Sequence, residues 1–165
     1  MADMSISQTP SLDCLIVPLF EGNLLLPQSV VVEVISRGDQ SLVFSPPVKA
    51  LPWLKGHFSW REQRLPVLSL MEVADAAQAS RITRFLVVHN LYFDPQKAQQ
   101  GPAFYAIEVR GIPHSIKIHR QDIRPWDAPA QSDDLIAMRV KASGVVCLIP
   151  HFERMAQRLG EHSDV

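Results

Sequence analysis

Short apolar runs alternate with turn residues along most of the chain, a pattern that predicts many short β-strands rather than helices. The expected strands cover residues 12–20, 24–26, 30–35, 56–60, 65–70, 84–93, 103–110, 114–119, 135–140 and 144–150. Glycine, asparagine and aspartate separate the first runs, and the prolines between residues 45 and 52 exclude regular structure there. Residues 71–80 are rich in alanine and fit either a short helix or a loop.

Only the end of the chain has helical spacing. Four apolar residues recur there at i, i+3, i+4 and i+7, namely Phe152, Met155, Ala156 and Leu159. Pro150 precedes this stripe and Gly160 follows it, the usual positions for a helix start and stop. We expect the stripe to pack on the rest of the domain, with docking of a partner as the alternative.

Composition narrows the possible functions. The 165 residues carry a net charge of −1, so no basic field attracts nucleic acid or an anionic membrane surface. No apolar run approaches the roughly 20 residues of a membrane-spanning helix, and residues 1–11 do not resemble a signal peptide. We therefore expect a cytoplasmic protein without direct membrane insertion, with flexible tails at residues 1–12 and 161–165 around one domain at 13–160.

Residues that could carry chemistry are scattered. His114 and His119 are five residues apart, so neither a strand nor a helix places them on one face. Cys14 and Cys147 each lie inside an apolar run, which predicts buried thiols rather than a metal site or a disulfide framework. Neither a Gly-x-Ser-x-Gly elbow nor a glycine-rich phosphate loop occurs in the sequence. The sequence predicts no enzyme activity, cofactor or metal.

One expected strand has a basic outer face. Alternation over residues 55–61 places Phe58 and Trp60 on the face toward the core. Lys55, His57 and Arg61 then point outward together. This basic strip fits either a solvated surface or a recognition surface.

A second strand predicts an apolar outer face. If Glu33 points to solvent, Val31 and Ile35 point the same way, because all three share one face of a strand. Such a strip is a candidate protein contact. The alternative is that both faces of residues 30–35 are buried and Glu33 lies at the strand end.

These segments resemble the CheW family. The sequence LPWLKGHFSWREQRLPVLSL at residues 51–70 is similar to the family's P-x-x-x-G-x-x-N-x-R-G-x-x-P segment, with Pro52, Gly56 and Arg61 at matching positions and Pro66 one residue after the last proline of the pattern. Further matches are AIEVRGI at 106–112, QDIRP at 121–125, and the final strand and helix. Their order agrees from about residue 14 to residue 159.

The resemblance implies an all-β fold of two interleaved SH3-like β-barrel lobes with a C-terminal helix. It also implies a non-catalytic adaptor that couples the cytoplasmic tips of methyl-accepting chemoreceptors to the regulatory domain of a CheA-type histidine kinase, recruited to membrane receptor arrays. The family's receptor-contacting arginine falls on Arg61, with Lys55 and His57 beside it. Its kinase-contacting Val-x-Glu element falls on Val31 and Glu33, with Ile35 on the same predicted face.

The chain also departs from the family pattern. Ser59, Glu62 and Ser69 stand where the family has Asn, Gly and Asp, and residues 94–102 form an insertion. Without the glycine, the turn after Arg61 is expected to differ, because glycine reaches positive φ most easily. These departures point to a specialised paralogue, of the ChpC type found in the Pil/Chp systems of type IV pili and twitching motility.

Two other functions remain open from the sequence. One is a small enzyme with a dispersed site built from residues such as His57, Arg61 and Glu62. The other is a small nucleic-acid-binding β-barrel in which Trp53, Phe58 and Trp60 stack on bases near Lys55.

Overall fold

The computed structural model describes residues 10–19, 22–38, 44–46, 51–70, 84–97, 101–126 and 135–162. The strands are β1 (Ser11–Pro18), β2 (Asn23–Pro27), β3 (Val31–Ser36), β4 (Phe44–Ser45), β5 (Leu54–Trp60), β6 (Gln63–Leu68), β7 (Arg84–His89), β8 (Phe104–Val109), β9 (His114–His119), β10 (Ile123–Pro125), β11 (Ile136–Ala142) and β12 (Val145–Pro150). The helices are η1 (Gln28–Val30), η2 (Arg120–Asp122) and α2 (Phe152–Glu161). Residues 71–80 lie outside the described residues.

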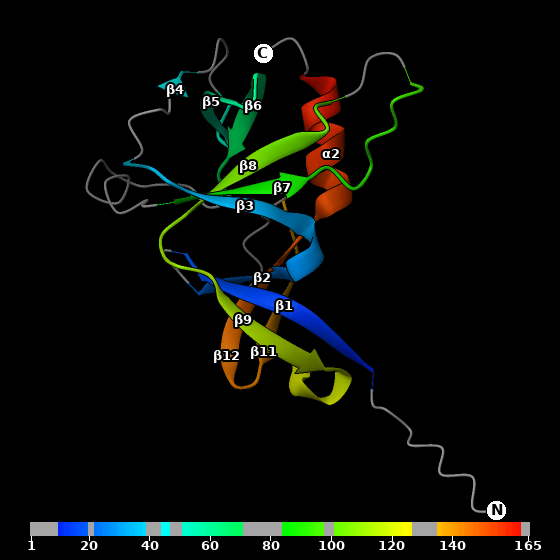
Figure 1. Cartoon of the computed structure of the whole chain (residues 1–165). Coiled ribbons are helices and arrows are strands. Elements are labelled where there is room, and N and C mark those ends of the chain that lie inside the picture. Colours follow the sequence, from blue (N-terminus) through cyan, green and yellow to red (C-terminus); the bar gives the residue numbers. More distant parts are fainter. Residues whose placement is uncertain are drawn as a thin grey trace, which may run out of the picture.

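These strands form two separate six-stranded sheets. Their strand orders are β10-β11-β12-β2-β1-β9 and β3-β7-β8-β6-β5-β4. The chain builds β1 and β2 of the first sheet, makes the whole second sheet, and then returns for β9 to β12 (Figure 1). The predicted all-β fold of two interleaved lobes with a C-terminal helix is therefore confirmed.

Three hydrophobic clusters fill the protein. The largest lies between the two sheets and takes Val17 and Leu24 from one, Leu86 and Ile107 from the other. Each sheet also curls around a cluster of its own, one centred on Phe58 and Phe85, the other on Val140 and Cys147. We call the lobe around Phe58 the second lobe and the lobe around Cys147 the first lobe.

Both cysteines are free and buried, as the sequence predicted. Cys14 and Cys147 belong to the cluster inside the first lobe. Burial raises the pKa of both thiols, and the charge of Asp13 adds to this effect at Cys14. The protonated thiol is the unreactive form, so both residues act as small hydrophobes.

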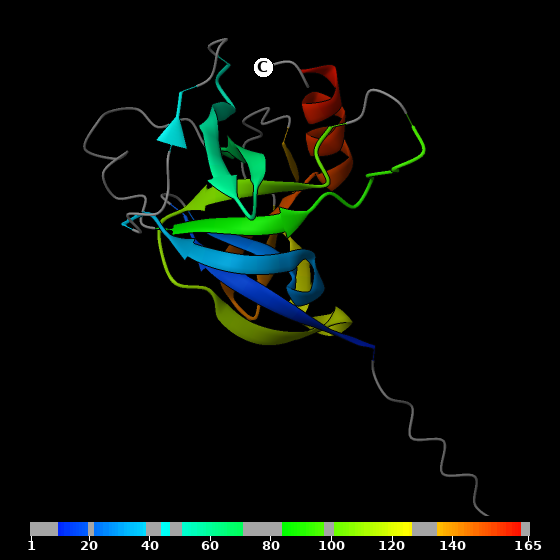
Figure 2. The ribbon, with the colours of Figure 1, turned by 45° about the horizontal axis from the view of Figure 1, so that its top comes forward.

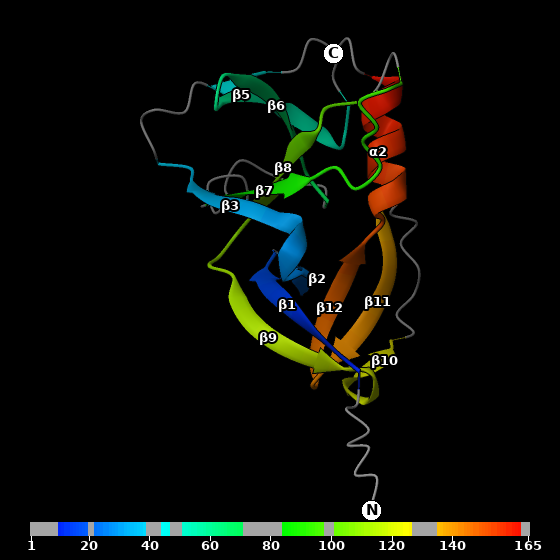
Figure 3. The same ribbon diagram turned by 45° about the vertical axis from the view of Figure 1, so that its right-hand side comes forward.

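The C-terminal helix packs on the domain, as expected. Met155 and Leu159 of α2 join the cluster between the sheets, and the Tyr105 hydroxyl donates to Met155 Sδ at 3.4 Å. His151 caps the helix, because its Nδ1 accepts from the Arg154 amide at 3.1 Å. Seen from the side, α2 stands along the second lobe and continues from β12 of the first (Figure 3).

Most predicted strands occur, and β9 has the predicted bounds. The expected strand at 84–93 ends early, at His89, because the chain turns at Asn90. The short strands β4 and β10 and the two 3-10 helices were not predicted. Only two or three residues form each of them, too few for hydrophobic periodicity to show.

The turn between β5 and β6 is formed by Arg61 and Glu62. Arg61 has a φ of 45° and Glu62 a φ of 63°, so both occupy the left-handed region that a two-residue hairpin favours. Register confirms the tight turn, because Trp60 pairs with Gln63. Glu62 therefore reaches positive φ without being glycine, at a cost of about 1–2 kcal/mol for a side chain there.

Replacing Met155 with alanine tests the docking of the helix. We expect the free energy of unfolding to fall by about 2–5 kcal/mol, because the side chain is fully buried and leaves a cavity. Urea denaturation followed by circular dichroism measures this loss. Gln157→Ala on the exposed side of the same helix is the control and should stay within about 0.5 kcal/mol. Equal effects for the two variants would contradict the packing.

Replacing Glu62 with glycine tests the strained turn. We expect the protein to gain about 0.5–1 kcal/mol, since glycine removes the left-handed strain and loses part of the gain to backbone entropy. Thermal melting checks the change. Gln63→Gly, one residue further in strand β6, should destabilise instead. A loss of stability in Glu62→Gly would show that Glu62 makes a compensating contact.

Candidate protein-interaction site

Glu33 meets two residues distant from it in sequence, Trp60 and Arg61, at the rim of the second lobe. The Trp60 indole Nε1 donates to Glu33 Oε2 at 2.7 Å, and the Arg61 guanidinium lies 3.4 Å from the same oxygen. The Arg61 Cζ atom also lies 4.5 Å from the centre of the Trp60 ring. We call Glu33, Trp60 and Arg61 the rim cluster.

The curl of the second sheet brings the rim cluster together. Glu33 lies on β3 at one edge of the sheet, while Trp60 ends β5 near the other edge. The β5–β6 hairpin stands over β7, β8 and β3 of the same sheet (Figure 2). The carboxylate of Glu33 therefore joins the two edges through side chains.

The two contacts of the Glu33 carboxylate differ in how much they stabilise the protein. The short hydrogen bond from Trp60 to a carboxylate is charge-assisted and satisfies an indole whose ring is buried. The Arg61–Glu33 pair is exposed at the surface, where such pairs contribute about 0–1 kcal/mol. Glu33 is therefore held in place by Trp60, while Arg61 stays available to another partner.

His57 does not lie on an exposed strip, which corrects the sequence prediction. Only 5% of this residue is accessible, although it alternates as expected with Phe58. The strand β5 has neighbours on both sides, and Arg64 on β6 covers the imidazole, with its NH2 3.3 Å from His57 Nδ1. Arg64 is the exposed cation here, a residue that analysis of β5 alone could not identify.

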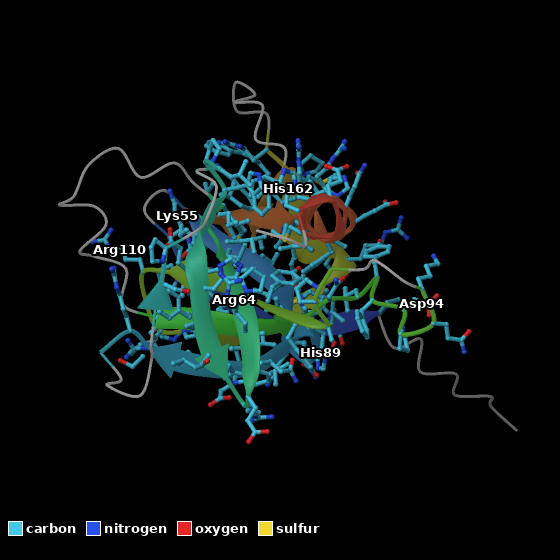
Figure 4. The ribbon with its side chains drawn as sticks, turned by 90° about the horizontal axis from the view of Figure 1, so that it is seen from above. Lys55, Arg64, His89, Asp94, Arg110 and His162 are labelled. Carbon is cyan, nitrogen blue, oxygen red and sulfur yellow. The ribbon has the colours of Figure 1, made fainter. Side chains whose placement is uncertain are left out.

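Lys55 is half-buried at the opposite end of β5 from Arg61, so the two do not form one strip. Six residues of extended strand separate them, roughly 20 Å at about 3.3 Å per residue. Figure 4 shows Lys55 toward one end of the hairpin and Arg64 further along it.

Lys55 instead faces Glu108 on β8. Burial raises the pKa of Glu108, while a hydrogen bond from Ser69 and the positive charges of Lys55 and Arg37 lower it. One oxygen of this carboxylate, Oε1, is buried without a hydrogen-bond partner among the described residues. The charge of Lys55 therefore serves to compensate a carboxylate of the lobe interior.

The predicted outer face of β3 is also corrected. Ile35 is buried in the second lobe with Phe58, and Val31 is half-buried against the cluster between the sheets. An irregularity of register between Val31 and Glu33 interrupts the alternation on which the prediction depended. Burial of both faces, the alternative left open, describes Ile35; Glu33, however, lies within the strand and not at its end.

An apolar surface on β3 does exist, on the face opposite to Glu33 and Ile35. Val34 is 41% exposed, and β3 is an edge strand of its sheet. Exposed edges offer backbone groups as well as side chains to another protein. Val34, Glu33 and the exposed part of Val31 together form what we call the β3 edge.

The structure does not assemble the dispersed site expected of an enzyme. His57 and Arg61 stay about 13 Å apart along β5, by the rise of roughly 3.3 Å per residue, and His57 is covered by Arg64. Within the described part of the chain, no three His, Cys, Asp or Glu side chains gather where they could hold a metal ion. No helix of the described residues is long and apolar enough to cross a membrane.

A comparison with solved structures finds a protein of the same fold. The crystal structure of the scaffolding protein TtCheW from Thermoanaerobacter tengcongensis matches with a TM-score of 0.60 and 15% identity, over 86% of this chain and 89% of that chain. At 15% identity, this match shows only that the two proteins share a fold. A comparison with curated protein sequences gives no significant match.

A family model supplies the assignment that the fold alone does not. The model of the CheW-like domain matches residues 13–160, which include both lobes and nearly all of α2. Members of that family are scaffold proteins without enzyme activity, which agrees with the prediction that this chain is not an enzyme. The chain belongs to the family of CheW-like domains.

Proposed function

We propose that this protein couples the cytoplasmic tips of methyl-accepting chemoreceptors to the regulatory domain of a CheA-type histidine kinase. The observation that carries the proposal is the rim cluster. It presents Arg61, at the family's receptor-contacting position, and Glu33, at the family's kinase-contacting position, on one rigid rim. The adaptor works in the cytoplasm and is recruited to receptor arrays at the membrane.

The receptor surface centres on Arg61. Its guanidinium is exposed, and the hairpin turn fixes its backbone, so little conformational entropy is lost when a partner binds. Arg64, exposed on the adjacent strand, adds a second cation to the same hairpin. His57 is buried beneath Arg64, and Lys55 lies at the other end of β5, so neither residue belongs to the receptor surface that we propose.

The kinase surface is the β3 edge. Val34 and the exposed part of Val31 supply apolar contact, and Glu33 supplies charge. Ile35 stabilises the strand from inside the second lobe.

Glu33 belongs to both surfaces. A partner that draws Arg61 away from Glu33 leaves a carboxylate held only by Trp60, and the charge presented to the kinase changes. The shared oxygen, Oε2, therefore gives receptor binding a direct physical route to the kinase contact.

We assign the protein to a ChpC-type paralogue of a pilus-based, twitching motility system. Ser59, Glu62 and Ser69 replace three residues of the usual family segment, and they lie along the receptor hairpin. These replacements support a receptor different from the usual one, bound at a tight hairpin turn.

Arg61→Glu tests the receptor surface. We expect the affinity for a soluble fragment of the organism's own chemoreceptor tip to fall at least tenfold, because the new charge repels both Glu33 and an acidic partner. The free energy of unfolding should change by less than about 1 kcal/mol. Titration calorimetry and thermal melting measure the two quantities.

The matched control for Arg61→Glu is Arg124→Glu, an exposed arginine on β10 of the first lobe. It makes the same change in charge and should leave receptor affinity intact. Equal losses in the two variants would mean that net charge alone drives binding, and the assignment of Arg61 would be wrong.

Val34→Lys tests the kinase surface. We expect the affinity for the kinase regulatory domain to fall at least tenfold, since a charged side chain replaces an apolar contact of at least about 1.4 kcal/mol. Val145→Lys is the matched control, because Val145 is 39% exposed against 41% for Val34 but lies in the first lobe. Unchanged affinity in Val34→Lys would remove the β3 edge from the kinase contact.

A further inference from the structure

The loop that follows β7 presents three consecutive apolar side chains to solvent. Leu91 is 54% exposed, Tyr92 56% and Phe93 39%. Scattered apolar residues on a surface are normal, but three adjacent ones at one turn form a protruding patch. We call Leu91, Tyr92 and Phe93 the apolar knob.

The apolar knob is held in a fixed conformation by Asn90. This buried residue donates from its side-chain Nδ2 to the Pro102 carbonyl at 2.9 Å, and its amide donates to the Ala103 carbonyl at 2.8 Å. Its side-chain and main-chain oxygens accept from the amides of Tyr92 and Phe93, each at 3.1 Å. A patch fixed in this way binds without a large cost in ordering the loop.

The returning end of the same loop packs on the C-terminal helix. A Cβ atom on Gly101 would lie 3.2 Å from the Leu159 side chain and from the Gly160 backbone, so the two segments are in close contact. The loop runs beside α2 in Figures 1 and 3. The apolar knob is therefore anchored at both ends of the loop, by Asn90 and by the Gly101 contact.

A ladder of ring contacts connects the apolar knob to the rim cluster. The Arg61 guanidinium lies over Trp60, whose ring centre is 5.3 Å from that of Phe104. The Phe104 ring is in turn 5.2 Å from the imidazole of His89, the residue just before Asn90. In Figure 4, His89 lies between the β5–β6 hairpin and the loop that carries Asp94.

We infer that the receptor-contact surface continues from Arg61 along this ladder to the apolar knob, and that the knob packs on an apolar stripe of the receptor's helical tip. This inference rests on the proposed function. The surface combines a cation at one end with exposed apolar groups at the other. A matching partner is a helix with an acidic residue facing Arg61 and apolar residues further along the same face.

The charges around the apolar knob favour a protein over a membrane. Asp94 follows Phe93 directly, and Lys97 is the next cation in the described part of the loop. Binding of a peripheral loop to an anionic bilayer usually depends on several clustered Lys or Arg residues. An apolar stripe on a helix needs no such cluster.

The test is a triple variant, Leu91→Ser with Tyr92→Ser and Phe93→Ser, titrated with the soluble fragment of the chemoreceptor tip. We expect at least a tenfold loss of receptor affinity and no change in affinity for the kinase regulatory domain. Ile112→Ser, at a residue 58% exposed after β8, is the matched control and should bind both partners normally. Tyr92→Ser alone should show a smaller loss and guards against misfolding of the triple variant.

Asn90→Ala tests the fixed conformation separately. It keeps all three apolar side chains but removes the bonds of the side chain to Pro102 and Tyr92, so receptor affinity should again fall. Wild-type receptor affinity in the triple variant, whatever the affinity of Asn90→Ala, would overturn the inference.

Two further measurements address membrane binding and the receptor contact of Arg61. Sedimentation with vesicles of phosphatidylglycerol and phosphatidylcholine would overturn the inference if the wild type bound and the triple variant did not, because the knob would then be a membrane contact. Arg61→Glu is titrated in parallel. If it binds the receptor normally, the proposed function itself fails; if only the triple variant binds normally, the extension to the apolar knob fails alone.

Discussion

The hydrophobic cluster between the two sheets is the constraint on which the rest of the structure depends. Leu15 and Leu26 come from the first sheet, Leu86 and Tyr105 from the second, and all four are buried in this one cluster. Burial of such side chains stabilises by about 1.5–3 kcal/mol each, so separation of the lobes would be costly. Because α2 completes the same cluster, the lobes and the helix form one unit that fixes the hairpin and the β3 edge relative to each other.

Within that unit, Glu33 is a charged residue on the inner side of a strand. It shares its face with Ile35, which is buried, yet its carboxylate reaches the rim and finds Trp60. The Trp60 ring is buried, and its indole N–H without an acceptor would cost about 1–3 kcal/mol, which explains why a carboxylate stands at this position. The same requirement places an acidic group beside Arg61, so the chemistry of the interaction site follows from the need to satisfy one strand residue.

The sequence predicted the elements better than their surroundings. Residues 114–119 and the helix from Phe152 could be identified because their periodicity is local and regular. The family resemblance located Arg61 and Glu33, but their contact joins residues 28 positions apart and depends on the curl of the sheet. His57 and Ile35 were misplaced for two different reasons. A side chain from the next strand covers His57, whereas Ile35 shares an inward face with Glu33, whose carboxylate is accommodated there by the Trp60 indole.

The return of the chain to its first sheet has a consequence for folding. β1 pairs with β9, more than 100 residues later in the Ser11–His119 register, and β2 pairs in parallel with β12 at Asn23 and Cys147. The second sheet, by contrast, is built from β3 to β8 without interruption. During synthesis, the second sheet has all its strands once Val109 has emerged. The outer partners of β1 and β2, which are β9 and β12, are synthesised only in the last third of the chain. Non-local pairing of this kind slows folding, since a long loop must close before its contacts form. The first two strands are thus the part of the nascent protein that spends longest with exposed edges, and a chaperone that acts on this protein would act there.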